Sequence, residues 1–414
     1  MFLRWAAPPA AEPSAPSEPA TRPFGLNLIG FAFGELGIGE DVRMAAAACE
    51  AAGIPYSVVN IHPGEHLRQA DRSLADRVCS NRDGSEAPYA INVFCLTGFD
   101  TARVALERGA PLFEGRFNVG WWPWELPVWP GDWGIAFSLV DEVWAATEFT
   151  REMYTKAAAL ASPNPTPVML MPLAACVARV TPMTRRQLGL PEKRFLFLYV
   201  FDFNSYLARK NPFAALKAFQ QAFDAGDQSV GLVLKTMNSN PANPVWKRFV
   251  RECSRDARIV LIDKTMDRGE VLGLIKSCDA YLSLHRSEGF GRTLAEAMLC
   301  GKPVIGTDFS GNVDFLGPDV GFPVEWKPTA VRELAYPFVT AADAAWWAEP
   351  NLGSAAARMK DARTAAASAG FAMAVTSFAQ TQFSQTSIGT NIFDRLINIC
   401  GPNQVSTRRI DIRC

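Results

Sequence analysis

The sequence has few histidines, almost no net charge and no long apolar run. Only His62, His66 and His285 occur, and Pro63 and Gly64 prevent a helix that would bring the first two onto one face. No metal site is therefore expected. The formal charge of −1 argues against nucleic acid as a partner. No apolar stretch reaches the roughly 18 residues that a membrane-spanning helix needs.

The nine cysteines are scattered and form no Cys-x-x-Cys pair, which fits a reducing compartment and weighs against a zinc site. Residues 1–23 are rich in Ala, Pro and Ser, and Pro8 and Pro9 interrupt their only apolar part. This segment is not typical of a signal peptide, and we expect a disordered leader. The sequence predicts a cytoplasmic protein and leaves peripheral contact with the inner membrane face open.

The chain holds 414 residues, of which 49% are hydrophobic, so it can form two domains of ordinary size. A strand at Gly25–Phe31, a glycine loop, an alanine-rich helix to about Ala52 and a strand at Tyr56–Ile61 begin the first. This order is typical of a doubly wound α/β domain. We place the first Rossmann-like domain at residues 24–180 and the second at 181–385, with a linker helix within 181–192.

The most informative segment is 281–306, which reads as a strand, a glycine loop, a helix and a second strand. Gly289 and Gly291 allow a sharp turn and a close approach of the backbone to a ligand. Amides at the start of the following helix would face an anion, since the helix dipole is positive there. These amides belong to Phe290, Gly291, Arg292 and Thr293.

Glu288 stands before this loop, and Glu296 stands about one turn into the helix. Neither carboxylate suits a phosphate, but both suit sugar hydroxyls. Amides for phosphate beside carboxylates for hydroxyls predict a nucleotide-sugar site.

This Glu-x7-Glu arrangement around Gly-Phe-Gly resembles the signature of retaining glycosyltransferases of family 4, also called glycosyltransferase group 1. The run Trp346–Pro350 and the alanine-rich helix after it resemble a C-terminal pattern of the family's bacterial members of the polysaccharide-biosynthesis type. The resemblance implies the GT-B fold, with two Rossmann-like domains and an interdomain cleft. It implies that Glu288 meets the donor sugar, the amides of Gly289–Gly291 the diphosphate, and Glu296 the ribose. It also implies that the helix and tail at 386–414 cross back to the first domain.

Three cations are further candidates for the donor diphosphate. Arg209 and Lys210, before the helix at Pro212, resemble the family's second phosphate-binding element, with a surface basic pair as the alternative. Relatives often carry an arginine nearer the strand, where Asp202 stands here. Lys235 ends an apolar strand and needs a partner, which donor phosphate would supply.

Two more loops are candidates for donor contacts. Gly37 and Gly39 follow the first strand, where relatives present a glycine loop to the cleft. A tight turn that only packs helix on strand is the alternative. By resemblance, Gly311 and Asn312 lie near the donor sugar.

The run Trp121–Trp133 is rich in tryptophan and follows a predicted strand. It predicts either a platform for an acceptor sugar or a packed aromatic core under a loop. Glu125 is its ionisable residue, and by resemblance it lies close to the reacting sugar.

The resemblance implies an enzyme that moves a hexose from GDP-mannose or a UDP-hexose to a glycan or glycolipid acceptor. The resemblance also implies retention of the anomeric configuration, independence of metals and cofactors, and a role in cell-surface polysaccharide or lipopolysaccharide assembly. The catalytic candidates are Glu288, Lys210, Arg209, Lys235 and Glu125. A GT-B epimerase, a phosphorylase and a non-catalytic nucleotide-sugar-binding or scaffold protein are the alternatives.

Overall fold

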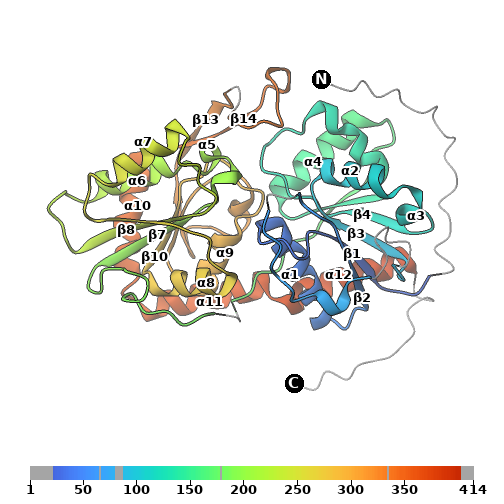
Figure 1. The fold of residues 1–414 in the computed structure, drawn as a ribbon, viewed down its shortest axis with the longest axis horizontal. Coiled ribbons are helices and arrows are strands. Elements are labelled where there is room, and N and C mark those ends of the chain that lie inside the picture. The colour runs from blue at the N-terminus through green and yellow to red at the C-terminus, as the bar shows by residue number, and fades with distance from the viewer. Residues whose placement is uncertain (1–21, 65–66, 80–86, 178–179, 333–334, 402–414) are drawn as a thin grey trace.

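The computed structural model describes residues 22–64, 67–79, 87–177, 180–332 and 335–401. Nearly all of the predicted leader, and the tail from residue 402, lie outside these ranges. Two α/β domains stand side by side, each around its own six-stranded sheet (Figure 1). The doubly wound two-domain architecture predicted from the sequence is thus confirmed.

The first sheet has the strand order β2-β1-β3-β4-β5-β6, and neighbouring strands run parallel. Its central strands β1 and β3 are buried along their whole length, as parallel strands covered on both faces should be. The strands are β1 (Leu26–Gly30), β2 (Tyr56–Asn60), β3 (Ile91–Cys95), β4 (Phe117–Gly120), β5 (Glu142–Ala145) and β6 (Val168–Leu170). The α-helices are α1 (Gly37–Ala51), α2 (Gly98–Arg108), α3 (Ala110–Phe113) and α4 (Glu148–Ala161).

The second sheet has the order β12-β11-β10-β7-β8-β9 and is also parallel. Its strands are β7 (Phe195–Val200), β8 (Val230–Thr236), β9 (Ile259–Asp263), β10 (Ala280–Ser283), β11 (Val304–Thr307) and β12 (Phe322–Val324). The helices around it are α5 (Leu207–Lys210), α6 (Pro212–Ala222), α7 (Pro244–Cys253), α8 (Arg268–Ser277), α9 (Arg292–Leu299) and α10 (Leu352–Ala365).

The predicted helix within the linker 181–192 is wrong. This segment holds only turns, and Gly189 adopts a φ of 68° that ends the one helical turn present. The linker is instead fastened to α8, because Thr181 N donates to Gly269 O at 3.1 Å and Ser277 Oγ donates to Met183 O at 2.8 Å. Tertiary contacts with α8 therefore replace local helix formation.

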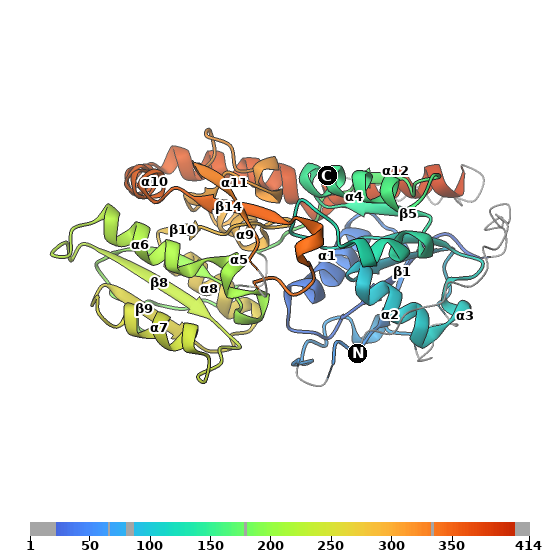
Figure 2. The ribbon, with the colours of Figure 1, turned by 90° about the horizontal axis from the view of Figure 1, so that it is seen from above.

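The last two helices lie along one side of the molecule and span both domains (Figures 1 and 2). Helix α11 (Ala369–Phe383) packs beside α9 of the second domain, whereas α12 (Gln385–Cys400) packs on α1 of the first. Arg395 Nε on α12 donates to Glu142 Oε1 at 3.0 Å, and this carboxylate is buried. The last described helix therefore packs on the first domain.

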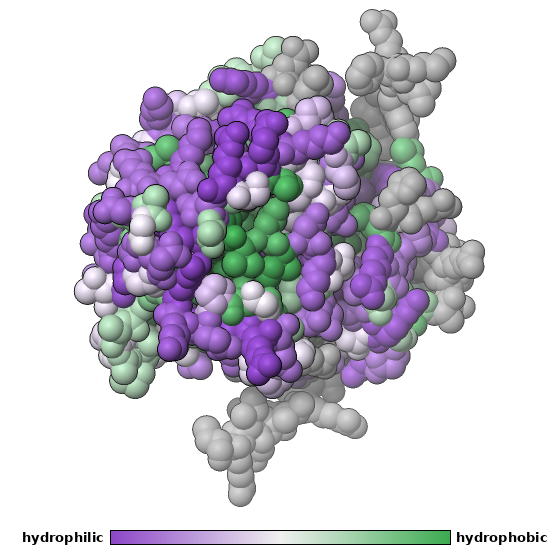
Figure 3. All heavy atoms as spheres, turned by 60° about the vertical axis from the view of Figure 1, so that its left-hand side comes forward, coloured by the Kyte–Doolittle hydropathy of each residue, from purple (hydrophilic) through white to green (hydrophobic). Residues whose placement is uncertain are grey.

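Strand β9 is an edge of the second sheet, and its apolar residues at 259–262 all keep part of their surface exposed. Figure 3 turns the second domain toward the viewer and shows an apolar area framed by hydrophilic side chains. Among the described residues, no helix is long and apolar enough to cross a membrane.

Gly389→Ala should weaken the contact between α12 and α1, because a Cβ there would lie 2.3 Å from Ala48 O. We expect the free energy of unfolding to fall by about 1–3 kcal/mol, as overpacking usually costs. Gly370→Ala on α11 is the matched control, since its Cβ would meet nothing nearer than Ser368 Oγ at 3.6 Å. It should be neutral or slightly stabilising. Urea unfolding of both variants checks this, and equal effects would contradict the close packing.

Candidate functional site

The glycine loop lies at the carboxyl edge of the second sheet, between β10 and α9, and faces the first domain. Gly291 caps α9 with a φ of 92°, a conformation that favours glycine. Within the described chain, the amides of the four residues that start α9 donate no hydrogen bond. These are Phe290, Gly291, Arg292 and Thr293. The loop therefore leaves four amides without an acceptor in the described protein, as an anion site would require.

Main-chain contacts press this loop against two other segments. A Cβ on Gly289 would lie 2.4 Å from Trp124 O in the first domain, and one on Gly311 would lie 2.0 Å from Gly289 O. Thr147 Oγ1 donates to Gly289 O at 3.0 Å, and Gly311 N donates to Glu288 O at 2.8 Å. Gly289 is thus required by the packing between the two domains, and Gly311 by packing within the second domain.

Four of the predicted catalytic residues meet in what we call the charge cluster, formed by Glu125, Arg209, Lys210 and Glu288. Lys210 Nζ donates to Glu288 Oε1, and Arg209 Nη1 lies 3.2 Å from Glu288 Oε2. Arg209 Nη2 lies 3.4 Å from Glu125 Oε1, which comes from the first domain. The cluster therefore joins the glycine loop, α5 and the facing domain.

Burial and neighbouring charges set the protonation of this cluster. Burial raises the pKa of Glu288, but Lys210 and Arg209 outweigh it and lower the pKa to about 2. Burial lowers the pKa of Arg209, yet Glu125 and Glu288 raise it above its ordinary value. Burial lowers the pKa of Lys210 more than Glu288 raises it. Glu288 is therefore ionised and holds both cations at the mouth of the loop.

Lys235 lies outside the charge cluster, at the carboxyl end of β8. Its side chain is 2% exposed, and it forms no ion pair with another described residue. Burial lowers its pKa despite the fields of Asp202, Glu270 and Asp263. The partner that the sequence predicts for Lys235 is thus not supplied by the described part of the protein.

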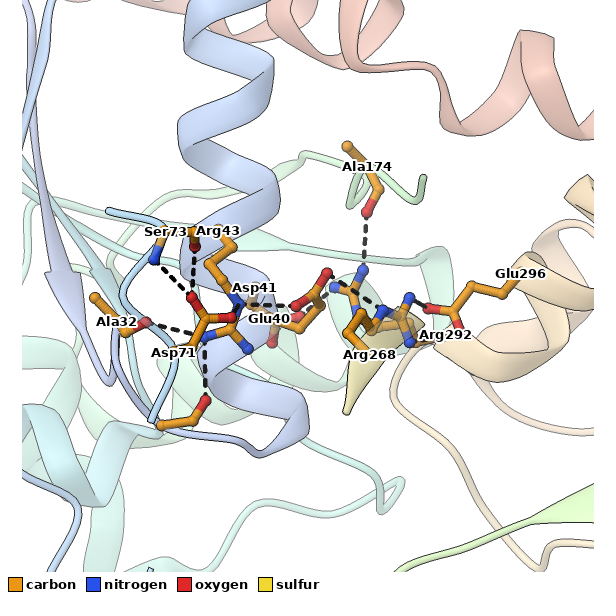
Figure 4. A network of polar contacts seen from close by, with 11 residues as sticks. Ala32, Glu40, Asp41, Arg43, Asp71, Ser73, Ala174, Arg268, Arg292 and Glu296 are labelled. Atoms are coloured by element: carbon orange, nitrogen blue, oxygen red, sulfur yellow. Dashed lines mark hydrogen bonds and ion pairs between the residues drawn. The ribbon is translucent and has the colours of Figure 1, made fainter. Parts of the chain in front are cut away.

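Glu296 binds an arginine that the sequence analysis missed (Figure 4). Arg268, at the start of α8, donates from Nη1 to Glu296 Oε2 at 2.9 Å and from Nη2 to Oε1, and the carboxylate is fully buried. Arg268 Nε also lies 3.6 Å from Glu40 Oε1 of α1. An isolated arginine after a capping Asp267 has no distinctive sequence signal, so this pair was unforeseen.

A second arginine also reaches the first domain in Figure 4. Arg292 pairs with Asp41 of α1 and donates to Ala174 O at 2.9 Å. Its side chain is therefore occupied in joining the domains, and only its backbone amide is free for a ligand.

Gly39 supports the tight-turn interpretation of the first glycine loop. A Cβ there would lie 2.3 Å from Gly34 O, whereas one on Gly37 would meet nothing within 4 Å. The turn brings Glu40 and Asp41 toward the two arginines of the second domain. The turn therefore contributes to the contact between the two domains.

Asn312 belongs to a buried network. His285 Nε2 donates to Asn312 Oδ1 at 2.9 Å, and Ser283 Oγ donates to His285 Nδ1 at 2.9 Å. Asn312 Nδ2 donates to Thr307 O at 2.9 Å. Both ends of the Asn312 amide are therefore engaged in holding the loop behind the charge cluster.

The tryptophan-rich run forms a packed aromatic core, so the alternative of a sugar platform is wrong for its buried rings. Trp121, Trp122 and Trp124 are at most 4% exposed. Trp121 packs on Trp144, while Trp122 and Trp124 pack on Trp129. Packing large aromatic rings against one another is favourable because it removes their apolar surface from water.

An arm of the second domain covers this core and was not foreseen. It runs from β13 (Trp326–Ala330) to β14 (Trp346–Pro350), an antiparallel pair that rises between the domains in Figure 1. Tyr336 from the arm packs edge-on against Trp124 and donates from Oη to Glu125 Oε2. The arm therefore fixes the Glu125 carboxylate that faces Arg209.

Residues 180–334 match the model of the family described as Glycosyl transferases group 1. This match lies in the second domain. No curated protein matches the sequence of the chain. Membership of family 4 is more specific than this match and stays a prediction.

Solved structures show the same architecture across nearly the whole chain. Anabaena Alr3699/HepE in complex with UDP-glucose has 16% identity and a TM-score of 0.62, covering 90% of this chain and 99% of that one. Sucrose-phosphate synthase (tll1590) from Thermosynechococcus elongatus has 15% identity and a TM-score of 0.62, covering 91% and 99%. The predicted GT-B fold is therefore confirmed.

Acid should destabilise the protein through His285. Burial lowers the pKa of this imidazole from 6.5 to about 4, so between these values the unfolded chain binds a proton that the folded chain excludes. The free energy of unfolding should be unaffected by this group above pH 6.5 and fall by roughly 3 kcal/mol as the pH drops toward 4.

His285→Gln should remove this fall in the free energy of unfolding between pH 6.5 and 4. The control is His62→Gln, which changes an exposed histidine and should leave the fall unchanged. Chemical unfolding between pH 7 and 4 measures the difference. An unchanged slope in His285→Gln would contradict the assignment.

Proposed function

We propose that the protein transfers a hexose from a nucleotide diphosphate sugar to a glycan or glycolipid acceptor. The observation that carries this proposal is the charge cluster at the start of α9, where Lys210 and Arg209 meet Glu288 beside unbonded amides. A diphosphate leaving group gains negative charge during transfer. Cations and amides that are already in place stabilise such charge without rearranging.

The donor diphosphate lies against the α9 amides and the two cations in this proposal. Lys210 then exchanges its bond to Glu288 for one to phosphate, and Glu288 turns to the donor hydroxyls. Lys235, buried without an ion-pair partner among the described residues, adds a third cation. Glu296 and Gly311 contact the donor, with Arg268 orienting the Glu296 carboxylate.

A UDP-hexose is the first donor to test, and GDP-mannose is the second. Similar structures hold UDP with glucose and UDP-glucose, which supports the uridine donor. Transfer proceeds with retention by a front-face displacement, in which the leaving phosphate accepts the proton of the acceptor hydroxyl. No metal or cofactor takes part, and the proposed setting is surface-polysaccharide or lipopolysaccharide assembly in the cytoplasm.

Glu125 marks the acceptor side of the site. It belongs to the first domain, is fixed by Tyr336 and faces Arg209. A carboxylate there can accept a hydrogen bond from the incoming hydroxyl. Closure of the two domains around both substrates would exclude water from the transfer.

A thermal-shift panel of UDP- and GDP-sugars tests donor binding. We expect one sugar nucleotide to raise the Tm of the full chain, because any ligand that binds only the folded state stabilises it. If no member of the panel does so, the transferase proposal fails. NMR of the product with the active donor then reports the anomeric configuration.

Lys210→Met should lower kcat with the active donor by about 10²–10³-fold, the usual effect of removing one charge-stabilising group. The matched control is Lys156→Met on α4, whose side chain is 76% exposed. That variant should keep wild-type kcat. Steady-state assays decide, and a Lys210→Met enzyme with normal kcat would place the diphosphate elsewhere.

A further inference from the structure

A cavity of about 650 Å³ lies in the second domain, and no residue of the charge cluster lines it. Leu207 and Ala208 of α5 line it, while Arg209 and Lys210 of the same short helix reach Glu288. We call this cavity the basic groove. Its volume lies within the range of small-molecule sites.

The charged residues that line the basic groove are all positive. They are Lys217, Arg248, Arg286 and Arg332. Arg286 Nε donates to Glu349 Oε2 at 2.6 Å and Arg248 Nε donates to Glu252 Oε1 at 2.7 Å, so these two cations are partly neutralised. Lys217 forms no ion pair with a described residue, and no carboxylate lines the groove. Its wall therefore favours an anion.

Two helices also begin at this wall. Asn211 and Phe213 stand at the start of α6, and Asn243 and Val245 stand at the start of α7. The amino end of α6 carries partial positive charge, which adds to that of the side chains, whereas at α7 the Asn243 side chain already accepts from Val245 N and Trp246 N.

Aromatic rings form the remaining wall, from Phe203, Tyr206 and Phe213. We propose that the basic groove is a second anion site, separate from the charge cluster, which binds a phosphate or pyrophosphate ester whose organic part is apolar. The cations and the start of α6 bind the phosphate, and the rings pack on the organic part. This site stands independently of the proposed sugar transfer.

Isothermal titration of the full chain with geranyl pyrophosphate tests the site. Lys217→Gln/Arg248→Gln should weaken binding at least tenfold, with circular dichroism to confirm folding. Lys210→Met, which alters only the charge cluster, should leave the affinity unchanged. UDP in excess should not compete with the probe.

Three results would overturn the proposal. The first is that geranyl pyrophosphate does not bind the wild type. The second is that Lys210→Met or UDP abolishes binding while the groove variant still binds, which places the probe in the charge cluster. The third is that inorganic pyrophosphate binds as tightly as the geranyl ester, which removes the role of the aromatic wall. Binding that follows the groove residues and favours the ester supports it.

Discussion

The ion pair between Glu288 and the two cations of α5 is the interaction on which the rest of the site depends. Each partner is largely buried, and a buried charge is tolerated only when it is paired. Without Glu288, Arg209 and Lys210 would repel each other; without the cations, burial would raise the pKa of the Glu288 carboxylate. In the proposed function, a diphosphate replaces the carboxylate as the partner of these two positive charges at the mouth of the glycine loop.

The glycine loop and the helices beside it also join the two domains. Glu40 and Asp41 of α1 face Arg268 and Arg292, and the Gly289 loop lies against the Trp124 backbone. Helix α12 and the arm through Tyr336 add contacts from the second half of the chain. The loop that would bind the ligand is therefore also part of the contact between the domains.

Local patterns were enough to predict the fold and the glycine loop. Continuous apolar strands such as β7 and the strand–glycine–helix order at 281–306 carry their structure in neighbouring residues. Arg268, the arm and the linker contacts depend on residues far apart in sequence, and no local pattern specifies them. The tryptophan-rich run shows the limit of local sequence patterns, because it is compatible with both a sugar platform and an aromatic core. Only the burial of its rings in the folded protein distinguishes the two.

A crystal structure of the protein with UDP-glucose tests the central claim most directly. The account predicts that Lys210 Nζ leaves Glu288 and lies within hydrogen-bond distance of the diphosphate, whose oxygens accept from the amides of α9. A complex in which the diphosphate lies away from α9 while Lys210 stays paired with Glu288 would contradict it.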